Sequence, residues 1–230
     1  MMTLVGFGCL QMSNIARNNT KRVLMVATAS AAWFALLLQF HLTMRTSIAN
    51  GMNTVGAILT YFSFFTLLTN LIVALVLTFS LLGPNTRWGR FFSSPAVATG
   101  TALYIATVGV TYSVLLQHVW DPEGLDKLAD ILLHDVVPVM YVVFWIFFVP
   151  KSGLRWKNPL SWAIYPVIYL AWILIRGAIS GRYPYPFVDV GQLGYPHVLL
   201  NSGMLLGIFL VVSFAVIAVA RWKLPKTVNN

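Results

Sequence analysis

Residues 61–70 read Tyr61-Phe-Ser-Phe-Phe-Thr-Leu-Leu-Thr-Asn70, a run of aromatic and aliphatic side chains that contains a few hydroxyls and one amide. On a helix, Ser63, Thr66 and Asn70 stand at i, i+3 and i+7 and therefore share one face. In a lipid bilayer, side chains that need hydrogen-bond partners must face protein or a wet cavity rather than lipid. The stretch therefore predicts a membrane helix whose single polar face is directed inward.

The composition of the whole chain agrees with a membrane location. Of the 230 residues, 58% are hydrophobic and 9% are charged, whereas soluble domains carry roughly 25% charged residues. The formal net charge of +9 does not indicate nucleic-acid binding, because the lysines and arginines lie in short segments between apolar runs. The one cysteine, Cys9, excludes an intrachain disulfide and a cysteine-rich metal site.

Six segments of the chain are long and apolar enough to span a bilayer, which requires about 20 mostly apolar residues. Segments rich in Gly, Pro and Asn separate them. The six are Val23–Thr43, Val55–Leu82, Ala96–Gln117, Leu128–Val149, Leu160–Ser180 and Val198–Ala220. We expect a single domain, an all-α bundle of six transmembrane helices. The sequence contains no internal repeat of the kind that many transporters have.

The distribution of lysine and arginine predicts the orientation of this bundle. Counted on alternate sides of the six segments, 11 of these residues fall on the side that holds both termini and 4 fall on the other. Cytoplasmic loops carry the excess of positive charge in membrane proteins. Both termini are therefore expected in the cytoplasm, with the protein in the cell membrane.

The fourth segment places an ionisable group at the depth of Thr66. Asp130, His134 and Pro138 follow one another at i+4 and share one face. Pro138 has no N–H, so the carbonyl of His134 loses its helical partner and the helix is expected to kink. At about 1.5 Å per residue, His134 and Thr66 lie at similar depths below the outer surface. The two can meet, and Asp130 could orient the imidazole.

Other polar residues in the outer half are candidates for substrate binding. The fifth segment carries an aromatic stripe that ends in a base, formed by Tyr165, Tyr169, Trp172 and Arg176. This face suits an acyl chain, with an anionic head at Arg176. Asn70, Arg176 and Asn201 are candidate donors to an oxyanion. Asn70 could equally tie helices together, and Arg176 could extend to the interface.

Three motifs, taken in order, resemble one known family. They are Phe64-Phe-Thr66-Leu-Leu-Thr-Asn70, Leu133-His134-Asp-Val-Val-Pro138 and Gly181-Arg-Tyr-Pro-Tyr-Pro-Phe187. The chain is similar here to the androgen-induced protein family, which includes the androgen-dependent regulators of tissue factor pathway inhibitor and has bacterial members. The resemblance covers the second to sixth segments. It implies a six-helix intramembrane threonine hydrolase that cleaves fatty acid esters of hydroxy fatty acids, with Thr66 as nucleophile and His134 as acid and base.

The expected function is therefore hydrolysis of these or related lipid esters, without metal or organic cofactor. The expected partners are the ester substrate and membrane lipids, not nucleic acid. Three alternatives remain open. Thr66 could simply bond back to the carbonyl of residue 62 or bridge helices. The histidines of the outer half could hold a metal ion in a metal-dependent hydrolase; these are His41, His118, His134 and His197. The protein could also bind or transport lipids without catalysis.

Overall fold

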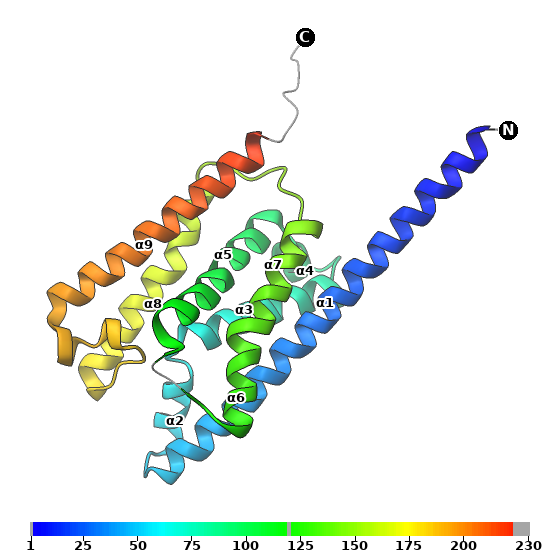
Figure 1. The fold of residues 1–230 in the computed structure, drawn as a ribbon. Coiled ribbons are helices and arrows are strands. Elements are labelled where there is room, and N and C mark those ends of the chain that lie inside the picture. The colour runs from blue at the N-terminus through cyan, green and yellow to red at the C-terminus, as the bar shows by residue number, and fades with distance from the viewer. Residues whose placement is uncertain (1, 119–120, 223–230) are drawn as a thin grey trace.

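A computed structural model describes residues 2–118 and 121–222, with side chains from Asn14 onward. The described residues form helices and loops and contain no strand. Six of the helical segments are long and apolar enough to cross a membrane. The prediction of an all-α bundle of six transmembrane helices is thus confirmed. The start of α1 and the end of α9 lie at the same end of the bundle (Figure 1), as an even number of crossings requires.

The helices follow one another with short connections. They are α1 (Met2–Ala49), α2 (Thr54–Tyr61), α3 (Phe65–Leu82), α4 (Arg87–Phe92), α5 (Pro95–Thr111), α6 (Gly124–Ile131), α7 (Val137–Phe148), α8 (Asn158–Ser180) and α9 (Val190–Trp222). Two π-helical turns continue longer helices, namely η1 (Tyr112–Leu116) after α5 and η2 (Leu132–Val136) between α6 and α7. A short 3-10 turn, η3 (Pro186–Val188), precedes α9.

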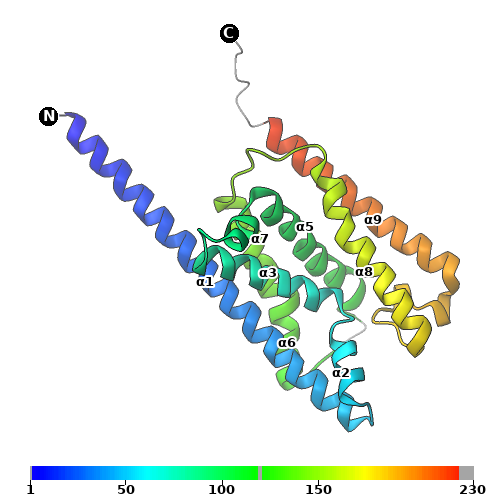
Figure 2. The ribbon, with the colours of Figure 1, turned by 180° about the vertical axis from the view of Figure 1, so that it is seen from behind.

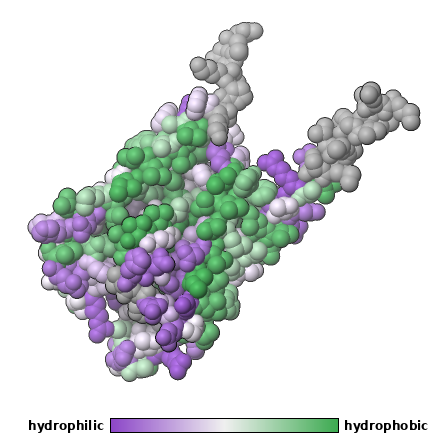
Figure 3. Space-filling view, in the orientation of Figure 1, coloured by the Kyte–Doolittle hydropathy of each residue, from purple (hydrophilic) through white to green (hydrophobic). Residues whose placement is uncertain are grey.

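The bundle has two parts that meet along α5. In Figures 1 and 2, α1 lies along one side, the α8–α9 pair lies along the other, and α3, α5 and α7 lie between them. The larger core packs α1, α3, α5 and α7 around fully buried residues such as Ala35, Val73 and Ile105. A second core joins α5 to α8 and α9 through Tyr104 and Trp162. Figure 3 shows a broad hydrophobic band across the bundle, with hydrophilic residues gathered toward the end that holds α2 and α6.

The structure corrects the continuous helix expected over Val55–Leu82. α2 ends at Tyr61, and α3 begins only at Phe65. The hydroxyl of Ser63 donates to the carbonyl of Leu59, a local side-chain bond that competes with regular helix hydrogen bonding. The three residues of this break, 62–64, lie between two helices in an otherwise apolar run. Ser63 and Thr66 therefore do not share the face of one continuous helix.

The aromatic stripe on α8 satisfies the backbone of this break. The indole Nε1 of Trp172 donates to the carbonyl of Phe62 at 3.2 Å, and the hydroxyl of Tyr169 donates to the carbonyl of Ser63 at 2.8 Å. Lipid offers no hydrogen bonds, so non-helical backbone at membrane depth persists only where protein or water supplies them. Arg176 extends the same contact by donating to the Thr60 hydroxyl at 3.0 Å. The stripe therefore fastens α8 to the α2–α3 break.

Where the sequence predicts a kink of the helix at Pro138, the structure has η2, a π-helical turn that ends two residues before this proline. π-helical turns inside longer helices often mark functional sites. The last segment also differs in its start: α9 begins at Val190 rather than Val198 and is interrupted at Gly194. Gly194 has φ of 72°, in the region that favours glycine. Residues 181–189, which connect α8 to α9, bring Tyr185 to the site described next.

Candidate active site

Thr66 occupies the second position of α3, and the break before it gives this position its properties. The first four amides of a helix have no acceptor within the helix. The N–H of Thr66 instead donates to the hydroxyl oxygen of Tyr185, with nitrogen and oxygen 3.4 Å apart. The threonine is 7% exposed. Its hydroxyl therefore lies inside the protein, beside a backbone N–H that points into the same space.

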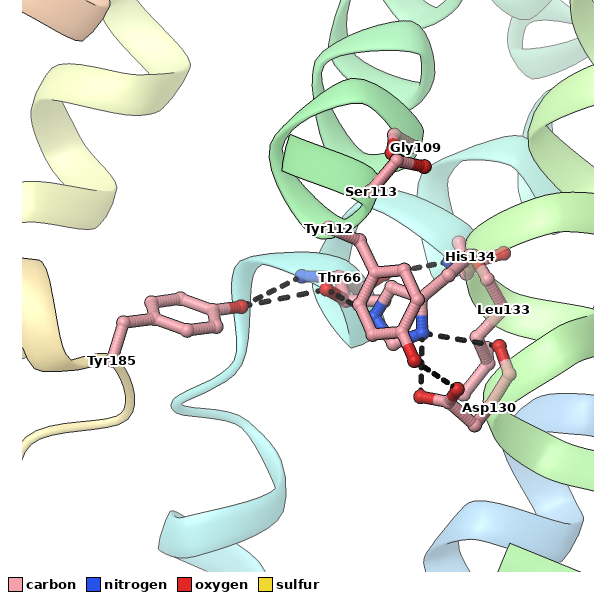
Figure 4. Close-up of polar contacts among 9 residues, drawn as sticks. Thr66, Gly109, Tyr112, Ser113, Asp130, Leu133, His134 and Tyr185 are labelled. Carbon is pink, nitrogen blue, oxygen red and sulfur yellow. Dashed lines mark hydrogen bonds and ion pairs between the residues drawn. The ribbon is translucent and has the colours of Figure 1, made fainter. Parts of the chain in front are cut away.

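The Thr66 hydroxyl faces His134. Its Oγ1 is 3.3 Å from His134 Nε2, and the other ring nitrogen, Nδ1, is 3.0 Å from Asp130 Oδ1 and 3.0 Å from the Asp130 carbonyl (Figure 4). Tyr112 donates to the second carboxylate oxygen of Asp130. The Tyr112 ring also stacks on the imidazole, with ring centroids 3.9 Å apart. A hydroxyl, an imidazole and a carboxylate thus form one chain of contacts.

Contacts with the backbone fix the positions of Thr66 and His134 relative to each other. Asn70 is fully buried, and its amide donates to the carbonyl of Thr66 at 2.9 Å and to that of Leu133 at 3.1 Å. Asn70 therefore connects Thr66 to Leu133, the residue next to His134. Gly109 packs against η2 so closely that a Cβ there would lie 3.2 Å from the His134 carbonyl. Of the two interpretations that the sequence left open for Asn70, these contacts support the structural one.

Tyr185 and Tyr112 are the residues at this site that the sequence did not predict. Tyr185 lies in the segment between α8 and α9, and its hydroxyl is 3.4 Å from Thr66 Oγ1, on the side opposite His134 (Figure 4). Its ring packs edge-on against Phe64 and stacks on Phe187. Burial raises the pKa of Tyr185, so its hydroxyl remains a hydrogen-bond donor. The signal for Tyr185 in the sequence is its position between two prolines, Pro184 and Pro186.

The two remaining predicted binding residues, Arg176 on α8 and Asn201 on α9, contact the segment that connects these helices rather than Thr66. We call this segment, residues 181–189, the cap. Asn201 donates to the carbonyl of Phe187 at 3.0 Å. Arg176 donates to Thr60 and to the carbonyl of Arg182. Both side chains brace residues 182–187, the segment that carries Tyr185. Their contacts position that tyrosine; they do not point to an oxyanion at Thr66.

Two cavities meet at the threonine. The first has a volume of about 140 Å³ and lies among α5, α8, α9 and the cap. The second, of about 510 Å³, lies among α1, α2, α3 and α6 and includes His134 and Asp130 in its wall. Four residues line both cavities: Thr66, Tyr112, Leu116 and Tyr185. The hydroxyl, its histidine and Tyr185 therefore face a space that can receive a molecule from two directions.

The other histidines do not join this site. His41, His118 and His197 are exposed, whereas His134 is partly buried. Among the side chains that the structure describes, those of residues 14–118 and 121–222, no three of His, Cys, Asp or Glu come close enough together to hold a metal ion. The alternative of a metal-dependent hydrolase thus finds no ligand set in the described part of the chain.

Comparisons of the chain with models of protein families, with curated proteins and with solved structures gave no match. Function is therefore inferred from the geometry around Thr66 and from the resemblance of the three motifs. Of the six predicted site residues, the structure brings four together: Thr66, His134, Asp130 and Asn70. Arg176 and Asn201 instead donate hydrogen bonds to carbonyls of the cap.

Proposed function

We propose that the protein is an intramembrane ester hydrolase with Thr66 as nucleophile and His134 as general acid and base. One observation carries the proposal: the contact chain from Thr66 Oγ1 through His134 to Asp130 lies where two cavities meet. Nucleophile, base and a group that orients the base are the parts that acyl transfer through a hydroxyl requires. The substrate is a lipid ester drawn from the membrane, and the motif resemblance implies a fatty acid ester of a hydroxy fatty acid or a related ester.

In the first half of the reaction, His134 Nε2 removes the proton as Thr66 Oγ1 attacks the ester carbonyl carbon. The carbonyl electron pair moves onto oxygen and forms a tetrahedral oxyanion. When the oxyanion collapses, the bond to the alcohol oxygen breaks and His134 returns its proton to that oxygen. The fatty acyl group is then bound to Thr66. Water, activated by the same imidazole, releases it as a carboxylic acid.

Asp130 supports this proton transfer by selecting the tautomer of His134. A carboxylate beside Nδ1 favours the proton on that nitrogen, which leaves the lone pair of Nε2 for the threonine. It also stabilises the imidazolium that forms as Thr66 is deprotonated. Tyr112 fixes the carboxylate by a hydrogen bond and the imidazole by stacking. General acid–base assistance of this kind typically contributes on the order of 10²–10⁴-fold in rate.

The oxyanion requires donors, and two converge beside the threonine. The N–H of Thr66 and the hydroxyl oxygen of Tyr185 are 3.4 Å apart, so a carbonyl oxygen that lies beside both, and takes the place of the Tyr185 oxygen as acceptor of the N–H, can accept from both. Donors fixed before the reaction begins stabilise the developing charge without reorganisation. The positive end of the α3 dipole lies at the same place and favours negative charge. Tyr185 and the Thr66 amide thus replace Asn70, Arg176 and Asn201 as the proposed oxyanion donors.

The test is covalent labelling with a fluorophosphonate probe, which reacts with activated hydroxyls, combined with an ester-hydrolysis assay. Wild-type protein in detergent should be labelled and active, and Thr66→Ala and His134→Ala should lose both properties. Thr69→Ala is the matched control, because that hydroxyl contacts Tyr165 rather than a histidine. Labelling that persists in both site variants would overturn the assignment. Activity lost to a chelator without any labelling would favour a metal-dependent enzyme instead.

A further inference from the structure

The two cavities that meet at Thr66 differ in chemistry, and this difference bears on the substrate. The smaller cavity is walled largely by apolar side chains of α8 and α9, among them Val167, Ile173 and Phe209. Val167 is 48% exposed on a membrane-spanning helix, so this wall borders the lipid. An acyl chain held here can lie against apolar side chains and continue into the bilayer. The smaller cavity therefore suits the acyl half of an ester.

The larger cavity is also lined mostly by apolar surface, but its wall is more polar than that of the smaller cavity and includes two carboxylates. Besides Thr66, Tyr112 and Tyr185, which line both cavities, five uncharged hydroxyl or amide side chains line it: Gln39, Thr43, Thr46, Ser47 and Thr60. Its charged members are carboxylates, Asp126 near the exposed end and Asp130 beside His134. Among the described residues, no lysine or arginine lines this cavity. Hydroxyl and amide groups pair well with hydroxyls, whereas a second carboxylate would meet only like charge.

We propose that the leaving group of the substrate is a compact, uncharged polyol, as in a monoester of glycerol. The larger cavity holds the polyol, and Asp126 disfavours an alcohol that carries a free carboxylate. The inference rests on the proposed hydrolase function and restricts it, because a hydroxy fatty acid leaves with both a long apolar chain and a carboxylate. The carboxylate of such a leaving group would meet the like charge of Asp126 and Asp130 in this cavity.

Arg176 is a cation that contacts a residue in the wall of the larger cavity. Its guanidinium donates to Thr60 Oγ1 at 3.0 Å and to the carbonyl of Arg182 at 3.3 Å. Thr60 therefore lies between the guanidinium and the cavity, and two donor groups of the arginine are already engaged. The charge that a leaving group meets directly in this cavity is that of the carboxylates.

The experiment compares three esters of one acyl chain with wild-type protein in detergent. The leaving groups are glycerol, hydroxystearic acid, and the methyl ester of hydroxystearic acid, which has the same chain without the charge. We expect the highest kcat/KM for the glycerol ester and the lowest for the carboxylate-bearing ester, with the methyl ester between them. A highest kcat/KM for the carboxylate-bearing ester would overturn the proposal. Absence of hydrolysis for all three, with no probe labelling of Thr66, would instead overturn the hydrolase function.

Asp126→Asn separates the charge effect from the shape of the cavity. This variant should raise kcat/KM for the carboxylate-bearing ester relative to that for the glycerol ester by about threefold, because a partly solvated charge acts weakly over several ångströms. The gain should shrink as salt is added. Glu123→Gln removes one charge from the residue that precedes α6, and Glu123 does not line the cavity. This variant should leave the ratio of kcat/KM for the carboxylate-bearing ester to that for the glycerol ester unchanged. Equal effects of the two variants on all three esters would refute selection by Asp126.

Discussion

Thr66 differs from several other intramembrane threonines in what its hydroxyl contacts. The hydroxyls of Thr28, Thr101 and Thr107 each donate to the carbonyl four residues earlier, the usual arrangement for threonine in an apolar helix. At Thr66 the residue four positions earlier is Phe62, which lies outside α3 and whose carbonyl accepts from Trp172. The hydroxyl is thereby left to His134 and Tyr185, contrary to the simplest structural interpretation of the sequence.

Asp130 lies 3.0 Å from His134 Nδ1, and we expect its carboxylate to contribute to the rate of hydrolysis. Replacing it with asparagine keeps the shape but removes the charge and offers Nδ1 an amide, which favours the wrong tautomer. We expect Asp130→Asn to lower kcat by about 10²–10⁴-fold, measured by ester hydrolysis. Asp135→Asn is the matched control, because Asp135 is exposed on the same helical turn. Equal activity of both variants and wild type would remove Asp130 from the mechanism.

Tyr185 gives a second prediction at the residue scale. Tyr185→Phe keeps the ring between Phe64 and Phe187 and removes only the hydroxyl. Loss of one oxyanion donor should lower kcat by about 10²-fold with little change in KM. Tyr183→Phe serves as control, because Tyr183 lies in the same segment as Tyr185 but its ring packs on Gly177 of α8. A raised KM at constant kcat would mean that Tyr185 only lines the cavities.

At the scale of elements, the break between α2 and α3 is the feature that builds the site. It starts a helix inside the bundle, directs the first amides of α3 toward Tyr185 and frees the Thr66 hydroxyl from α2. Periodicity could not reveal it, because residues 61–70 contain neither proline nor glycine and read as a continuous apolar helix. The break depends on donors from α8, more than 100 residues later in the chain.

The stability of that break can be measured through Tyr169. Tyr169→Phe leaves the Ser63 carbonyl without its donor in a region that lipid surrounds. We expect the free energy of unfolding to fall by about 1–3 kcal/mol, seen as a lower midpoint of thermal unfolding in detergent. Tyr195→Phe makes the same chemical change at a residue that is 50% exposed, where surface substitutions change stability by roughly 0.5 kcal/mol or less. Equal midpoints for the two variants would show that water satisfies the Ser63 carbonyl instead.

For the whole molecule, the sequence predicts those features that depend on the residues of a single segment. The six apolar spans follow from local composition, and the face shared by Asp130 and His134 follows from helix periodicity, because neither depends on distant residues. Tyr185 and Tyr112 reach the site from other segments of the chain. Nothing in the spacing of one segment reports which side chain of another will face it, so their contacts emerge only from the packed bundle.

The orientation of the bundle determines which compartment receives the products, and it can be tested directly. Eleven of the 15 lysines and arginines lie on the side of the termini, so we expect that side in the cytoplasm. In a Cys9→Ser background, which leaves the chain free of cysteine, a cysteine introduced at Asn50 should react with a membrane-impermeant maleimide in intact cells. One introduced at Ser152, in the loop after α7, should react only after the cells are permeabilised. The reverse pattern would turn the larger cavity and Asp126 toward the cytoplasm, and the polyol would then be released inside the cell by the same Thr66–His134 chemistry.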